Sequence, residues 1–490
     1  MSPLVLYFIA FAIFLYLCFL NLRTSHRLPP GPKPWPLVGN LPHLGSKRHH
    51  SMAALAQKYG PLMHLRMGLV HVVVAASASV AAQFLKAHDA NFSSRPPNSG
   101  AKYVAYNYQD LVFAPYEEVA VLTRALARAS PTEAVNLGQL LNVCTTNTIG
   151  RVMLGRRVVG DGSGGGDQKA VYFQSMVREL MVLSGVFNIG DFVPALEWLD
   201  LQGVAAKMKK LHRRFDAFLT EIVEDHKTNG FNGAEKYMLS TLISLKEEGD
   251  SDGLKPTDTE IKALLLNMFT AGTDTSASTV EWAIAELIRH PRILAKVQQE
   301  LDSVIGRERL VTESGLAQLT YLQALVKEAF RLHPATPLSL PRIAANSCEI
   351  NGYHIPKNST LLVNIWAIAR DPTIWADPLK FKLERFLAGG ENAGVDVKGN
   401  DFELIPFGAG RRICAGMSMA LRMVHLLVGT LVHAFEWDLA DGLKPADLNM
   451  EEAYGLTLQR SQPLMVHPKA RLSSDAYRAQ LLFIFCIFLT

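Results

Sequence analysis

Residues 406–416 read PFGAGRRICAG and contain the most informative residues of the chain. The glycines and alanines of this stretch let the backbone approach a flat, bulky ligand closely. The residues that follow predict a helix from about Ala415 to Phe435, which places Cys414 at the start of that helix. There the helix dipole and two neighbouring arginines favour the thiolate form of the sulfur. We therefore expect Cys414 to be a ligand, although a lone cysteine is usually an inert core residue.

A second informative stretch lies in the middle of a long predicted helix. This helix begins with a capping box formed by Thr257 and Glu260, and it must end before Pro291. Its length is about 48 Å at 1.5 Å per residue, and apolar residues on most sides predict that it is buried. Residues 271–276, AGTDTS, interrupt the apolar pattern, and glycine there costs about 1 kcal/mol relative to alanine. This turn is either a weakened turn that forms part of a site or the point where another helix crosses.

The composition of the 490 residues excludes several classes of protein. Apolar residues make up 49% and charged residues 19%, which is the opposite of the balance that disorder requires. A net charge of +4 without a dense Lys/Arg stripe indicates no nucleic-acid partner. The five cysteines are far apart and form no C-x-x-C pair, which argues against a disulfide framework and a zinc ribbon. Without an internal repeat or a second linker, residues 37–472 predict one domain, mostly α with small β-sheets near residues 63–75 and 348–364.

The N-terminal residues 3–22 contain no charged side chain and predict a transmembrane anchor. Twenty helical residues span about 30 Å, the thickness of the hydrocarbon core of a bilayer. Arg23, His26 and Arg27 follow directly, so the positive-inside rule places the rest of the chain in the cytosol. A cleaved signal peptide is the alternative, but no small-residue cleavage site followed by a polar run is present. Residues 28–36 are rich in proline and predict a stiff hinge after the anchor.

The cysteine stretch resembles the haem-binding loop of the cytochromes P-450, a family with the pattern Phe-x-x-Gly-x-Arg-x-Cys-x-Gly. Phe407, Gly410, Arg412, Cys414 and Gly416 match that pattern. The resemblance implies that Cys414 is the axial ligand of the iron of haem b. It also implies that Phe407 packs beside the sulfur, that Gly410 lets the loop approach the cofactor, and that Arg412 pairs with a haem propionate.

Further motifs of the same family occur in its order along nearly the whole chain. Residues 271–275 resemble its oxygen-activation groove, in which Asp274 and Thr275 would position protons for dioxygen. Glu328 and Arg331 resemble its Glu-x-x-Arg pair, and Arg385 would be the third member of a buried, structural ion network.

The same resemblance implies one more propionate partner, Arg342, and a mostly α cytochrome P-450 fold behind a membrane anchor. Residues 188–192, 394–402 and 454–460 are similar to the plant flavonoid 3'-hydroxylases. The implied activity is hydroxylation of the flavonoid B ring at the 3' position, with O2 and with electrons that NADPH–cytochrome P-450 reductase takes from NADPH. The implied location is the endoplasmic reticulum membrane, with a single span and a cytosolic catalytic domain. A monooxygenase of another plant phenolic is the alternative.

The sequence departs from this family directly after Tyr116. The family continues there with a basic helix containing Trp-x-x-x-Arg, and no such motif occurs between Tyr116 and Gly150. Roughly 30 residues are absent by this comparison, more than ordinary loop variation. The absent helix would pair with a propionate and help to dock the reductase, so a truncated family member with weak haem binding and no catalysis is a second interpretation. Residues 473–490 form an atypical C-terminal tail, and its apolar part, residues 481–489, is too short to span a bilayer.

Overall fold

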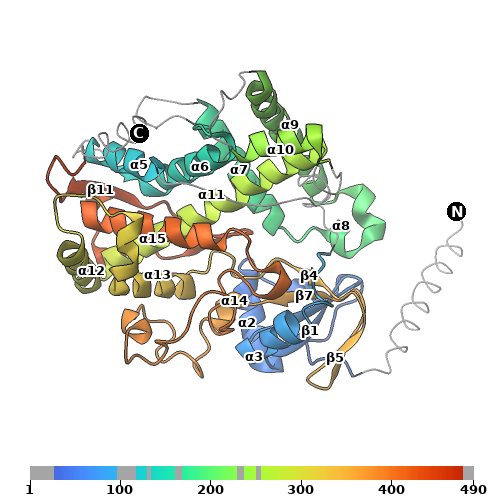
Figure 1. Cartoon of the computed structure of the whole chain (residues 1–490). Coiled ribbons are helices and arrows are strands. Elements are labelled where there is room, and N and C mark those ends of the chain that lie inside the picture. The colour runs from blue at the N-terminus through green and yellow to red at the C-terminus, as the bar shows by residue number, and fades with distance from the viewer. Residues whose placement is uncertain are drawn as a thin grey trace, which may run out of the picture.

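The computed structural model of the protein describes residues 27–96, 117–129, 134–159, 168–228, 237–249 and 255–477. The anchor predicted for residues 3–22 lies outside the described residues, and so does most of the predicted tail after residue 477. The described part is mostly helical with small sheets, which confirms the predicted fold class (Figure 1).

Helices form the larger part of the described chain, and Figure 1 shows α11 crossing the middle of the molecule. The helices of the first half are α2 (Arg48–Tyr59), α3 (Ala78–Ala82), α5 (Glu117–Ala127), α6 (Leu137–Leu154), α7 (Gln168–Gly185), α8 (Ile189–Phe192), α9 (Val204–Thr228) and α10 (Met238–Glu248). The helices of the second half are α11 (Asp258–Arg289), α12 (Pro291–Val304), α13 (Thr320–Leu332), α14 (Ile365–Ile368) and α15 (Met417–Ala434).

The strands of the described chain form small separate sheets, and both predicted β regions contain strands. In the four-stranded sheet the order is β1-β2-β7-β4, with β2 and β7 parallel and the other neighbours antiparallel. The smaller sheets have the orders β3-β11-β8, β9-β10 and β5-β6. The strands are β1 (Leu62–Met67), β2 (Val70–Ala75), β3 (Val135–Asn136), β4 (Arg342–Ile343), β5 (Cys348–Ile350), β6 (Tyr353–Ile355), β7 (Thr360–Val363), β8 (Phe435–Leu439), β9 (Glu452–Tyr454), β10 (Leu458–Arg460) and β11 (Met465–Ala470).

The ends of α11 lie where the sequence predicts them. Thr257 Oγ1 accepts a hydrogen bond from the Glu260 N–H (3.2 Å), and Glu260 Oε2 accepts one from the Thr257 N–H (2.7 Å). The helix ends at Arg289, before Pro291. It stays helical through the AGTDTS turn, where Thr275 Oγ1 donates to the Ala271 carbonyl (2.7 Å).

Helices α5, α6, α11 and α15 pack against one another and form the largest apolar core. Leu126, Leu141, Ile284 and Leu427, one from each helix, are at most 1% exposed. Truncating such a leucine or isoleucine to alanine costs about 2–5 kcal/mol. Among the described helices, α15 has the length and apolar composition of a membrane span, but 61% of it is buried inside the protein, as in the core helix of a soluble protein. The core therefore supports the helix that follows Cys414.

The described part of the proline-rich segment runs along β1. Pro30 O accepts a hydrogen bond from the His64 N–H (2.8 Å), and Pro32 O accepts one from Asn40 Nδ2 (3.0 Å). A Cβ atom at Gly31 would lie 1.9 Å from His64 O, so only glycine allows this close approach. The segment is thus attached to the sheet as it enters the body of the protein.

Candidate active site

The 406–416 loop presents Cys414 just before the N-terminus of α15. The Cys414 N–H donates to Phe407 O (2.9 Å), which closes the loop on itself. Gly410 has φ +70°, and a Cβ atom there would lie 2.3 Å from Leu85 O, so the loop requires glycine at this position. The side chain of Cys414 is exposed. The sulfur is therefore accessible at the positive end of a helix dipole, where a thiolate is favoured.

The AGTDTS turn of α11 lies beside the same end of α15. A Cβ atom at Gly272 would lie 2.8 Å from Ile149 Cδ1 on α6 and 4.0 Å from Met419 Cε, in the first turn of α15. The glycine thus lies where α6 packs on α11, which agrees with the helix-crossing interpretation of this turn. Ala271, in contrast, is exposed although it lies in the middle of a largely buried helix. The turn therefore combines a close helix contact at Gly272 with an exposed residue, Ala271.

Asp274 is buried and is held by two side chains from the β9–β10 hairpin. Thr457 Oγ1 donates to Asp274 Oδ2, and Gln459 Nε2 donates to Asp274 Oδ1 (2.7 Å). Burial raises the pKa of Asp274, and the hydrogen bonds from Thr457 and Gln459 oppose this effect. The sequence reasoning did not find these two partners. Their spacing of two residues, which places both on one face of an extended segment, was the available signal.

Arg342 and Arg412, which the sequence predicts as propionate partners, lie close to each other. Arg342 Nη2 donates to Ala409 O (2.7 Å), and Arg342 Nη1 lies 3.6 Å from Asp89 Oδ1. Nη1 is buried and makes no hydrogen bond with any described residue. Arg412 Nε donates to Ser93 O (2.6 Å). Arg342 therefore has a buried donor that makes no hydrogen bond with the described residues, and a bound acceptor would stabilise it.

Arg95 is a third arginine of this region, and the sequence reasoning did not assign it to the propionates. Its Nη1 donates to the carbonyls of Leu340 (2.8 Å) and Pro341 (3.0 Å). Burial, together with the positive charges of Arg342 and Arg412, lowers the pKa of Arg95 to about 10. Three cations share this region and repel one another, and the single carboxylate of Asp89 beside Arg342 does not balance all three, so the region favours a bound anion. Haem b with its two propionates fits this site, which offers an accessible cysteine, a loop and a turn of small residues, and the arginine cluster.

Glu328, Arg331 and Arg385 make contact with one another, and the side chain of each is 0% exposed. The Glu328 carboxylate accepts hydrogen bonds from Arg331 Nε (2.7 Å) and Nη2 (2.8 Å), and Arg385 Nε lies 3.3 Å from it. The network is linked to the cysteine loop through α13, because the rings of Phe330 and Phe407 pack edge to face with centroids 5.2 Å apart. The ion network can therefore stabilise the position of the cysteine loop through this ring contact.

Comparison with known proteins agrees with this geometry. The family model "Cytochrome P450" matches residues 29–129 and 116–466, and the chain belongs to this family of haem-thiolate monooxygenases. The chain is similar to a flavonoid 3'-monooxygenase of Petunia hybrida, with 66% identity over 97% of this chain and 99% of that protein. It is 63% identical to a flavonoid 3'-monooxygenase of Arabidopsis thaliana over 93% of this chain and 94% of that protein. It is 53% identical to a flavonoid 3',5'-hydroxylase of Crocosmia x crocosmiiflora over 95% of this chain and 96% of that protein.

The comparisons also show an interruption near Tyr116. The family match ends at residue 129 and starts again at residue 116, so it does not run continuously through this region. The alignment with the Petunia protein spans 507 positions but contains 97% of the 490 residues of this chain, which leaves about 30 positions without a counterpart here.

Proposed function

We propose that the protein hydroxylates the B ring of flavonoids at the 3' position, using O2 and electrons that a partner reductase takes from NADPH. The observation that carries this proposal is the accessible Cys414 just before α15, whose first turn approaches the AGTDTS turn of α11, in a chain 66% identical to a flavonoid 3'-monooxygenase. Haem, when bound, supplies the iron that reduces O2 and transfers one oxygen atom to the substrate.

The residues around Cys414 would bind and orient the cofactor. Cys414, as a thiolate, would be the iron ligand, and the carbonyl of Phe407 holds the backbone of this ligand in place. The guanidinium groups of Arg342, Arg412 and Arg95 would bind the two propionates.

Asp274 and Thr275, in the AGTDTS turn of α11, would hold and move protons. Burial raises the pKa of Asp274, so this carboxyl group keeps a proton at a higher pH than an exposed aspartate does. Thr275 Oγ1 donates to Ala271 O and can accept a hydrogen bond at the same oxygen. The Thr457 and Gln459 side chains fix the direction of the Asp274 carboxylate and prevent it from turning freely.

The proposed location is the endoplasmic reticulum membrane. Residues 3–22 would be the single span, and the catalytic domain would lie in the cytosol, where a reductase can reach it. The charge-free apolar segment and the basic residues directly after it support this orientation.

The test begins with the reduced protein in the presence of CO. We expect the long-wavelength Soret band of thiolate-ligated haem, and we expect Cys414→Ser to abolish it. Cys348→Ser, a change at a half-buried cysteine of β5, is the matched control and should keep the band. With reductase and NADPH, naringenin or dihydrokaempferol should give a product that has one more B-ring hydroxyl. A thiolate band without any such product would refute the flavonoid assignment alone.

A second candidate is a truncated member of the family that binds haem weakly and does not catalyse. The observation in its favour is the set of about 30 positions of the Petunia protein that have no counterpart in this chain. Inserting the corresponding Petunia segment after Tyr116 and measuring haem per chain distinguishes the candidates. Equal haem content in both chains would reject the truncated-member interpretation, and a large gain on insertion would support it.

A further inference from the structure

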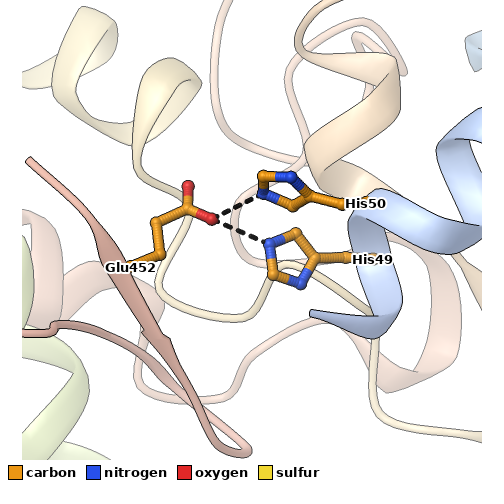
Figure 2. Close-up of side chains that lie close together, drawn as sticks. All are labelled: His49, His50 and Glu452. Atoms are coloured by element: carbon orange, nitrogen blue, oxygen red, sulfur yellow. Dashed lines mark hydrogen bonds and ion pairs between the residues drawn. The ribbon is translucent and has the colours of Figure 1, made fainter. Parts of the chain in front are cut away.

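Three potential metal ligands meet in the folded protein. His49 and His50 are neighbours in α2, and Glu452 follows them about 400 positions later in the chain. Figure 2 shows both imidazole rings directed at the same carboxylate oxygen. His49 Nε2 lies 3.0 Å and His50 Nε2 lies 2.7 Å from Glu452 Oε2, and the ligand atoms all lie within 4.8 Å of one another. In the described part of the chain, this is the one group of three such side chains with this spacing.

The three side chains are of the types that bind ions of the zinc class. The side chains of His49 and Glu452 are 0% and 10% exposed, so two of the three ligand groups are held inside the protein. Two imidazoles and one carboxylate form a common ligand set of Zn²⁺, with the fourth position open.

The surroundings hold two of the three ligands in a fixed orientation. Trp366 Nε1 donates to the other carboxylate oxygen, Glu452 Oε1 (3.1 Å), which leaves Oε2 available as a single-atom ligand. The ring of His50 stacks on the ring of Trp366, with centroids 4.2 Å apart. The side chain of His50 is 41% exposed, so an ion can reach the site from solvent.

One charged group opposes a cation at this position. The guanidinium of Arg370 lies 4.1 Å from the ring centroid of Trp366 and interacts electrostatically with Glu452. Burial lowers the pKa of Arg370 to about 9, so it remains largely charged at neutral pH. We therefore expect weaker affinity than that of a structural zinc site made of four ligands.

From this geometry we propose that His49, His50 and Glu452 bind one divalent transition-metal ion of the zinc class, with water as the fourth ligand. The two hydrogen bonds to Glu452 Oε2 would be replaced by bonds from Nε2 and Oε2 to the ion, with the proton of each imidazole on Nδ1. The ion would join α2, which follows the proline-rich segment, to β9 of the β9–β10 hairpin that holds Asp274.

The test uses the full chain in detergent, first freed of metal with a chelator and then titrated with Zn²⁺ against a chromophoric competitor. Wild-type protein should bind one equivalent that is lost or weakened roughly tenfold or more in His50→Ala and in Glu452→Gln. Trp366→Phe keeps a stacking ring but removes the N–H donor, and it should weaken binding by about tenfold. The matched control is His64→Ala, at the His64–His71 pair of β1 and β2, where the Nε2 and Nδ1 atoms are 2.8 Å apart. This control should still bind one equivalent of Zn²⁺.

X-ray absorption at the zinc edge of the loaded wild type tests the site without any variant and independently of haem iron. Two imidazoles and oxygen ligands, at distances of about 2.0–2.1 Å, are expected. A sulfur shell would place the ion at a cysteine, and an oxygen-only shell would place it at surface carboxylates. Either shell, or zinc binding that is equal in wild type and Glu452→Gln, would overturn the proposal.

Discussion

Replacing Glu328 by glutamine removes one charge from the buried ion network and keeps the shape of the side chain. In the folded protein the Glu328 carboxylate accepts hydrogen bonds from Arg331 Nε (2.7 Å), Arg331 Nη2 (2.8 Å) and the Lys382 N–H (2.9 Å). It also lies 3.3 Å from Arg385 Nε. Arg385 keeps a second carboxylate partner, Glu391 (2.7 Å), but among the described residues Arg331 forms its ion pair with Glu328 alone.

The expected loss in the free energy of unfolding is about 3–5 kcal/mol, because removing one member of a buried pair leaves a charge uncompensated in a low-dielectric interior. The free energy of unfolding of a typical domain is about 5–15 kcal/mol, so the variant should be measurably less stable and still partly folded. Guanidinium chloride denaturation followed by far-UV circular dichroism measures the loss. The denaturation slope should stay the same if the variant exposes the same surface on unfolding.

Glu384→Gln is the matched control, because Glu384 forms an ion pair with Lys296 (3.1 Å) on the surface. Exposed pairs contribute little to stability, so this variant should unfold close to wild type. If Glu328→Gln also unfolds within about 1 kcal/mol of wild type, the argument that the buried network stabilises the fold is wrong.

Three further changes test other parts of the site. Burial raises the pKa of Asp274, so the folded state favours the protonated carboxyl group. The stability that this group contributes at low pH is therefore lost as the pH rises through the raised pKa. Asp274→Asn should therefore gain stability relative to wild type as the pH rises above the ordinary aspartate pKa of 3.8, in urea titrations at about five pH values, and should form less product per NADPH. Arg95→Gln should lose haem to apomyoglobin roughly tenfold faster than wild type, because a charge-assisted hydrogen bond contributes about 1.5–3 kcal/mol. The control is Arg411→Gln, at an exposed arginine, and it should change the rate of haem loss less. Gly390→Ala should cost about 1–3 kcal/mol because the new Cβ would lie 2.2 Å from a backbone oxygen, while Gly394→Ala, with open space at that position, should leave the melting temperature unchanged.

Local features of the chain were predictable because they depend on neighbours in the sequence. The capping box at Thr257 and the barrier at Pro291 determine where α11 begins and ends, and both act within one helical turn. The loop before α15 was recognisable for the same reason, since its glycines and Cys414 follow one another directly. The contact of Glu328 with Arg331 was predictable because three residues separate neighbours on one face of a helix.

The sequence by itself determined the boundaries of α11, the loop that carries Cys414 and the family pattern, since each is encoded within a few residues. Only the tertiary structure brought Arg95 to Arg342, placed Thr457 and Gln459 on Asp274, and joined the histidines of α2 to Glu452. These partners lie far apart along the chain, and no local pattern specifies which of many polar side chains will meet. Their contacts arise when apolar packing of the helices and sheets brings distant segments together, because a buried polar group is then stabilised only by the partners that the packing supplies.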